Sequence, residues 1–173
     1  MLLSAKYVIP VTSEPLADTA VLVRDGRIAD IGDADKMRAS FEIAWTQAEA
    51  MLASVRWEEY GDVLFIGKSI GTIVASRYAH EKGLAVRSIL LTPLKETFAF
   101  VRGEAVAFHG TADPWANTDA IIAACRERGI LLHLTEDANH SLETGDVLRD
   151  IRTLETTMAK VDAFIGSRGG QLR

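Results

Sequence analysis

Three residues whose types suit nucleophilic catalysis follow one another along the chain. Ser69 lies in a Gly-Lys-Ser-Ile-Gly pentapeptide, Asp113 in a His-Gly-Thr-Ala-Asp-Pro-Trp segment, and His140 in an Asp-Ala-Asn-His-Ser segment. A serine hydroxyl is a weak nucleophile until a nearby imidazole accepts its proton, and a carboxylate can hold that imidazole in the required tautomer. These residue types therefore indicate acyl-transfer chemistry, provided that the fold brings them together.

Each of these residues follows a short apolar run. The runs cover residues 62–66, 105–108 and 130–134, and each reads as a buried strand. Open α/β sheets place their sites beyond the carboxyl ends of the strands. We therefore expect the three side chains to meet at one edge of a sheet.

The pentapeptide has the spelling of a nucleophile elbow. It stands between the strand at 62–66 and a predicted helix at 72–80. In such an elbow the serine lies on a sharp, strained turn, so the residues two positions away, Gly67 and Gly71, must be small. The turn also directs the amide of Ile70, at the start of the helix, towards a developing oxyanion.

Helices and strands alternate from Phe41 onward. Apolar residues recur at helical spacing over 41–55, and a final helix begins near Asp146. Asn117 or Thr118 is the expected cap of a helix that runs to residue 128. Strands are predicted at 62–66, 86–91, 105–109 and 130–135. Short, wholly apolar strands separated by helices predict an α/β fold with a mostly parallel sheet flanked by helices.

The first forty residues have a different pattern. A strand is predicted at 6–11, and the runs at 20–24 and 27–31 flank Asp25-Gly26, a strong signal for an antiparallel hairpin. We expect a junction within 32–42. The predicted organisation is an N-terminal β segment over 1–40, packed on or extending the sheet, an α/β domain over 41–165, and a disordered tail over 166–173.

From about residue 41 to 165 the chain resembles small serine hydrolases of the α/β-hydrolase superfamily. The resemblance rests on the pentapeptide with Thr72, on Thr92-Pro93-Leu94, on residues 108–115, and on Asn139-His140-Ser141-Leu142. It implies Ser69 as nucleophile, His140 as general base and Asp113 as the residue that orients the base. The fold is then a truncated α/β-hydrolase fold, because the segments that normally precede residue 41 in this family, including a His-Gly-Gly type oxyanion loop, are absent.

Residues 1–38 instead look like the opening β segment of metal-dependent amidohydrolases. The matching stretches are Ala5 to Val11 and Gly26 to Gly32. The His-x-His motif and the barrel of that family are absent, so its activity is not carried over. The chain therefore resembles a fusion of two unrelated pieces, natural or constructed.

Further side chains near the three residues are candidates for lining a pocket. Lys68, His109 and Trp115 are the expected pocket residues. The alternatives are a structural role for His109, simple exposure for Lys68 and ordinary packing for Trp115. Glu136 and Asp137 are rivals of Asp113 as the acid. A zinc site made of His109, Asp113 and His140 is a weaker alternative, because the spacing lacks a short ligand pair. We expect no metal and no cofactor.

The segment from Thr92 to Gly103 has the length of a small lid, and Phe98 and Phe100 are its candidate apolar wall. His80 and His133 are expected to lie at the surface or in the core without a chemical role. Cys125, the single cysteine, is expected to be a small core residue of the helix at 119–128.

Composition excludes several classes of partner. The 173 residues suit one domain, 48% of them are hydrophobic, the net charge is −5, and no basic run occurs, so nucleic acid is not an expected partner. No apolar stretch has the length of a membrane span, and no signal peptide is recognised, so a cytoplasmic location is expected.

Two functions remain open. The first is a serine hydrolase that acts on a small carboxylic ester or related acyl substrate. The second is a catalytically weak or inactive protein of the same fold, chimeric or with a structural or assembly role, because Ile70 supplies one oxyanion donor where two are usual. The open edge of the strand at 62–66 predicts a homo-oligomer, either a dimer or a swapped assembly.

Overall fold

The computed structural model describes residues 2–8, 16–24 and 27–167, with side chains from residue 42 onward. The chain divides into two compact units, Met1–Val55 and Arg56–Arg173. The sequence places the junction near residue 40, and that domain assignment stays a prediction. The tail predicted over 166–173 lies outside the described residues from 168 onward, while Gly166 is the last residue of a helix.

The first unit contains a three-stranded antiparallel sheet followed by a helix. Strands β1 (Leu2–Val8), β2 (Leu16–Arg24) and β3 (Arg27–Asp33) pair in the order β1-β2-β3. Arg24 lies opposite Arg27, which confirms the antiparallel pair predicted around Asp25-Gly26, although those two residues themselves are not described.

Two element boundaries in this unit differ from the sequence expectation. Strand β1 begins at Leu2 rather than at residue 6, and residues 9–11 of the predicted strand lie outside the described residues. Helix α1 (Ala34–Leu52) begins directly after β3, so the described chain has no loop within 32–42. The residues at its start include Ala, Lys, Met and Arg, which all favour helix, and this explains the earlier start.

The second unit is built on a four-stranded, wholly parallel sheet. Strands β4 (Leu64–Lys68), β5 (Arg87–Leu91), β6 (Ala105–Gly110) and β7 (Leu131–Thr135) lie in the order β4-β5-β6-β7. Helices α2 (Ile70–Glu81), α3 (Thr118–Arg128) and α4 (Val147–Gly166) alternate with them, together with the short 3-10 turns η1 (Trp57–Glu59) and η2 (Lys95–Ala99). The predicted α/β class, with a parallel sheet preceded by an antiparallel segment, is confirmed.

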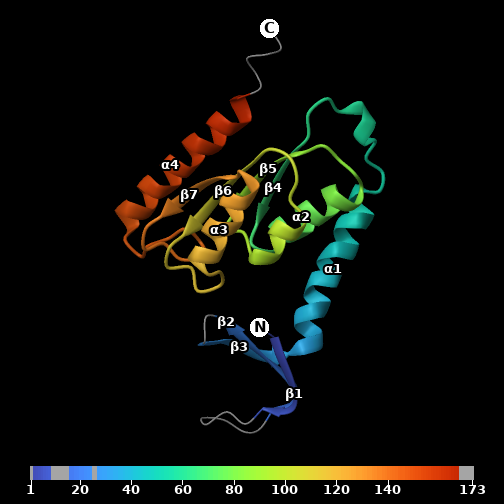
Figure 1. Ribbon diagram of the computed structural model, residues 1–173, viewed down its shortest axis with the longest axis vertical. Helices are drawn as coiled ribbons and strands as arrows, with labels where there is room; N and C mark the ends of the chain where they lie inside the picture. The colour runs from blue at the N-terminus through green and yellow to red at the C-terminus, as the bar shows by residue number, and fades with distance from the viewer. Residues whose placement is uncertain (1, 9–15, 25–26, 168–173) are drawn as a thin grey trace. The chain divides into compact units, whose positions relative to one another are not determined.

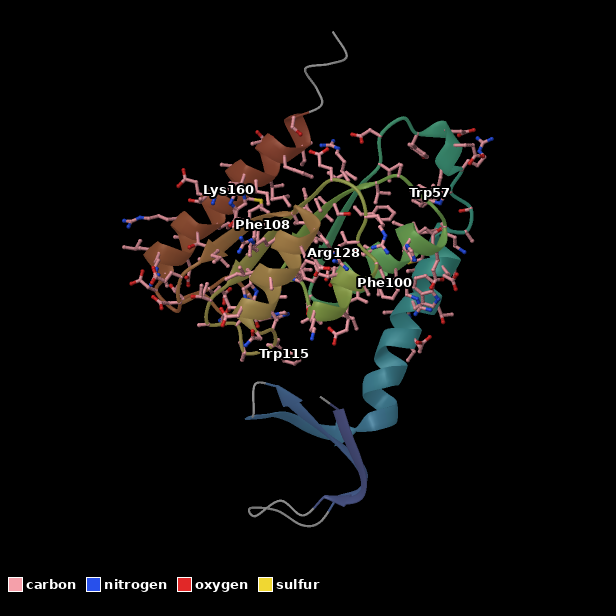
Figure 2. The ribbon with its side chains drawn as sticks, in the orientation of Figure 1. Trp57, Phe100, Phe108, Trp115, Arg128 and Lys160 are labelled. Carbon is pink, nitrogen blue, oxygen red and sulfur yellow. The ribbon has the colours of Figure 1, made fainter. Side chains whose placement is uncertain are left out.

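Helices cover both faces of this sheet (Figure 1). On the face towards α3, Leu90 and Ala107 pack with Ile121 and Cys125. On the face towards α4, Ile89, Val106 and Phe108 form a second cluster, and Phe108 is labelled beside this helix in Figure 2. The central strands are buried on both sides, which is why they read as continuous apolar runs.

The core also contains Phe98 and Cys125, for which the sequence predicts a lid wall and a core position, respectively. Phe98 packs in the cluster with Leu90 and is 3% exposed, so it does not form the wall of an open lid as expected. Cys125 lies in the same cluster, and burial raises the pKa of its thiol to about 11, which agrees with the expected structural role.

Side-chain caps define the helix starts. Asn117 Oδ1 accepts a hydrogen bond from Ala120 N at 2.8 Å, so Asn117 rather than Thr118 is the cap of α3. Asp146 caps α4 in the same way, through the amide of Arg149. Within the described part of the chain, no helix combines the length and the apolar character that crossing a membrane requires.

Candidate active site

Ser69 has the strained backbone of an elbow. Its φ is 52° and its ψ is −125°, a conformation that non-glycine residues rarely adopt. The turn is held on both sides, since Ser69 N donates to Leu91 O at 3.0 Å and Ser69 O accepts from the amide and the hydroxyl of Thr72. The hydroxyl of Ser69 therefore stands beyond the end of β4, at the start of α2.

The two glycines of the pentapeptide have different surroundings. A Cβ atom on Gly67 would lie 2.8 Å from Gly71 O and 2.9 Å from Thr72 Cα, so only glycine fits there without a shift of the backbone. A Cβ atom on Gly71 would meet no atom of the described residues within 4 Å outside its own helix backbone and its chain neighbours. The expectation that both positions must be small is thus correct for Gly67 and wrong for Gly71, because nothing in the described chain packs against that side of the helix start.

A buried pair of threonines, which local sequence patterns do not reveal, supports the elbow. Thr72 Oγ1 lies 2.6 Å from Ser69 O and 2.6 Å from Thr97 Oγ1, and both threonine side chains are fully buried. Thr97 comes from η2, within the segment that was considered as a lid. The position of Thr72 directly after the pentapeptide was the available signal for half of this pair.

The structure brings the three sequence candidates into one chain of hydrogen bonds. His140 Nε2 lies 2.7 Å from Ser69 Oγ, and His140 Nδ1 lies 2.7 Å from Asp113 Oδ2. Ser69 follows β4, Asp113 follows β6 and His140 follows β7, so all three lie at the carboxyl edge of the sheet. This is the arrangement in which an imidazole can accept a serine proton while a carboxylate holds the ring.

Asp113 is enclosed, whereas its rivals are engaged elsewhere. Its carboxylate is fully buried, and Oδ1 accepts a hydrogen bond from Trp115 N at 2.7 Å. Asp137 instead pairs with Arg149 at 3.1 Å, and the carbonyl of Glu136 accepts from the same guanidinium. Of the three acids weighed from the sequence, Asp113 is the one that contacts His140.

The loops that carry Asp113 and His140 are bonded to each other. Ala112 N donates to Ala138 O at 2.9 Å, and Asp137 N donates to Thr111 Oγ1 at 2.8 Å. A Cβ atom on Gly110 would lie only 2.2 Å from Ala138 O, so this close approach requires glycine. Gly110 therefore permits the close approach of the two loops that carry Asp113 and His140.

The predicted oxyanion donor lies at the first position of α2. Within the described residues, the amide of Ile70 makes no hydrogen bond to the protein, as expected for the first turn of a helix. An amide at a helix N-terminus is suited to negative charge because the helix dipole adds to the effect of the N–H group. The side chain of Ile70 is partly exposed.

Two of the predicted pocket residues lie at the surface of the site. Lys68 Nζ donates to His140 O at 3.1 Å, and Lys68 also lines a cavity of about 390 Å³ between the sheet edge and α4. The Trp115 ring centroid lies 5.8 Å from that of His140, and the indole, labelled in Figure 2, is 49% exposed. The third predicted residue, His109, is fully buried beside Asp113 and lies outside that cavity.

The zinc alternative finds no support in the side-chain positions. Among the described residues, no three His, Cys, Asp or Glu side chains are grouped so that they could hold a metal ion. Both ring nitrogens of His140 take part in hydrogen bonds to Ser69 and Asp113.

Comparison with protein families gives one match, which lies in the first unit. The bacterial imidazolonepropionase-like composite domain matches residues 20–41. This match supports the resemblance noted for residues 1–38, over the hairpin and the start of α1. No curated protein sequence matches the chain.

Comparison with solved structures gives proteins of the α/β-hydrolase type. One is a Xanthomonas campestris pv. campestris protein assigned to the α/β superfamily of hydrolases, with 19% identity and a TM-score of 0.46, over 74% of this chain and 70% of that one. Another is an α/β serine hydrolase homologue from Coxiella burnetii, with 18% identity and a TM-score of 0.44, over 72% and 55%. A third is esterase 2 of Thermogutta terrifontis, with 21% identity and a TM-score of 0.39, over 54% and 52%.

Proposed function

We propose that this chain is a serine hydrolase that acts on a small carboxylic ester or a related acyl substrate. The observation that supports it most is the unbroken chain of hydrogen bonds from Ser69 Oγ through His140 to Asp113, with both bonds at 2.7 Å. The strained backbone of Ser69 adds to this, because strain of this kind is found mostly at functional sites.

The reaction follows from the positions of the three side chains. Ser69 Oγ attacks the acyl carbon while His140 Nε2 accepts the serine proton, and the carbonyl oxygen becomes an oxyanion near the amide of Ile70. The C–O bond to the leaving alcohol then breaks, and the imidazolium returns its proton to that alcohol. Water attacks the acyl-enzyme, with His140 again as the base, and the acid product leaves with Ser69 restored.

Among the described residues, the site provides few donors to stabilise the negative charge of the oxyanion. Acyl transfer usually relies on two donors at the oxyanion, and removal of one costs about 10² to 10³ in kcat. The amide of Ile70 is one donor, and the sequence has no His-Gly-Gly segment to supply the usual second one. We therefore expect turnover to be slow and to favour esters with good leaving groups.

Labelling with a fluorophosphonate probe, followed by intact mass, tests the proposal directly. We expect one adduct per wild-type chain and none on Ser69→Ala. Ser167→Ala is the matched control, because Ser167 is an exposed serine beyond the end of α4 and should label like the wild type. Absence of an adduct on folded wild-type protein, or an adduct that persists in Ser69→Ala, would overturn the mechanism.

A second candidate function is assembly by a catalytically weak protein of this fold, which the open edge of the sheet favours. Within the described residues, β4 has a neighbouring strand only on the β5 side. Ile66 of β4 is 56% exposed, and α4 exposes a row of apolar side chains at Val147, Leu148, Ile151, Leu154 and Met158. An apolar surface beside an unpaired strand favours pairing with another copy of the chain, as a dimer or a swapped assembly, and a chimeric origin would account for it.

Light scattering on the full chain tests this second candidate. We expect a mass near twice the 18.9 kDa of the monomer, and a shift to the monomer in Ile66→Lys. The control is Ile122→Lys, which changes an exposed residue of α3. A wild-type monomer at high concentration would remove the assembly candidate.

A further inference from the structure

His109 is a buried imidazole that the proposed mechanism does not use. It lies near the end of β6 with no exposed surface, between Thr118 and the triad acid. Its Nε2 atom lies 3.0 Å from Thr118 Oγ1, and its Nδ1 atom lies 3.8 Å from Asp113 Oδ2. Among the described residues Nδ1 has no hydrogen-bond partner, which is unusual for a buried polar atom.

The carboxylate of Asp113 has room for another donor. It is fully buried, and it accepts one hydrogen bond at each oxygen, from Trp115 N and from His140 Nδ1. An ionised carboxylate can accept about four hydrogen bonds, and burial makes each missing donor costly. The Nδ1 side of the His109 ring faces Asp113 Oδ2, the oxygen that also accepts the hydrogen bond from His140.

The hydroxyl of Thr118 selects the tautomer of His109. If it donates to Nε2, the ring proton is on Nδ1 and faces Asp113. If it donates to Thr111 O instead, the ring proton is on Nε2 and a lone pair faces the carboxylate. The contact with Nε2 is shorter, 3.0 Å against 3.3 Å, and the negative charge favours an N–H group on the side of Asp113.

Burial lowers the pKa of His109, and the nearby His140 lowers it further, whereas the charge of Asp113 raises it. The lowering effects are larger, so the ring is neutral at neutral pH. A neutral ring carries one N–H group, which makes the choice of tautomer decisive.

We propose that His109 is a positioning residue whose Nδ1–H faces Asp113 Oδ2 and holds that oxygen towards His140. The proposal rests on the serine hydrolase mechanism above. In this arrangement the Asp113 carboxylate lies between two imidazoles. His140 is the imidazole that takes part in proton transfer, and His109 is the fixed imidazole that only positions the carboxylate. Loss of the fixed imidazole removes the N–H group that faces Oδ2 at 3.8 Å, and with it the electrostatic attraction that keeps the carboxylate from rotating away from His140.

Two substitutions separate the two nitrogens of the ring. The amide of Asn reaches about as far as Nδ1, and that of Gln about as far as Nε2, so His109→Asn keeps a donor towards Asp113 and His109→Gln keeps a partner for Thr118. We expect His109→Gln to lower kcat and the fluorophosphonate labelling rate about tenfold with KM unchanged, and His109→Asn to stay within about twofold of the wild type. A merely structural role would lower activity equally in both variants, in step with their thermal stability.

A measurement on the wild type keeps the test independent of whether the variants fold. The ¹⁵N shifts of the His109 ring report its tautomer, and we expect the proton on Nδ1; a proton on Nε2 would overturn the inference. Wild-type protein that fails to label would refute the hydrolase mechanism instead. Wild-type protein that labels, with equal rates in the Gln and Asn variants, would refute the role of His109 alone.

Discussion

The two sides of Ser69 differ in how completely the described chain builds them. On the side of His140, the acid, the base and their loops are joined by short hydrogen bonds, and Gly67 and Gly110 allow close backbone approach. On the opposite side the amide of Ile70 is the expected donor, and a Cβ atom on Gly71 would meet no neighbour. Proton transfer and charge stabilisation are separate requirements of acyl transfer, and under the proposed mechanism the described residues provide for the first more fully than for the second.

The largest effect is expected on the side of Ser69 where His140 and Asp113 lie. Asp113→Asn keeps the shape of the side chain but removes its charge and favours the wrong tautomer of His140. We expect kcat to fall by about 10⁴ for an activated ester, with little change in KM. Steady-state kinetics with circular dichroism as a folding control would measure it, and a loss below tenfold would mean that the acid side contributes little.

The two glycines test the comparison most directly. Gly67→Ala places a methyl group against the backbone of Gly71, so we expect displacement of Ser69 and a loss of about 100-fold in kcat. Gly71→Ala has open space, and in a helix it should raise stability by up to about 1 kcal/mol without loss of activity. Thermal melts and ester turnover of both variants provide the check. An equal loss of kcat in both variants would contradict the difference between the two sides of Ser69.

The threonine pair tests how the elbow is supported. Thr97→Val removes the buried partner of Thr72, and we expect a loss of about 1 kcal/mol in unfolding free energy and several-fold slower turnover. Thr92→Val is the matched control, because the hydroxyl of Thr92 is buried with no hydrogen-bond partner among the described residues, and its removal should cost nothing. Urea denaturation would measure both, and a larger loss in Thr92→Val would contradict this account.

The smallest effect is expected at Lys68. Lys68→Met removes the hydrogen bond to His140 O but keeps the apolar part of the side chain, so kcat should fall only about threefold. The bond is exposed and screened by salt, so the kcat advantage of the wild type over Lys68→Met should shrink as ionic strength rises. A loss of 100-fold would place Lys68 within the reacting groups.

Much of the fold was readable from local sequence. The strands of the second unit, the antiparallel pairing of β2 with β3 and the start of α4 after its cap Asp146 follow from apolar runs, turn residues and caps, which act over a few positions. The order of Ser69, Asp113 and His140 after three strands also predicted that they would meet, because parallel strands share one carboxyl edge. The start of α1 was missed because its first residues lack an apolar period.

Tertiary structure alone decided which groups are buried and what they touch. The contact of Thr72 with Thr97 joins residues 25 positions apart, and His109 gained its place against Asp113 through burial, which local patterns do not encode. Phe98 is a candidate lid residue in the sequence, yet its side chain packs in the core. Sequence by itself determined most of the elements and which three residues are the candidates for the proposed chemistry, because these depend on short-range spacing. The packing around them determined which acid contacts His140 and how each side of Ser69 is supported, because side-chain contacts across the fold depend on the whole arrangement of strands and helices.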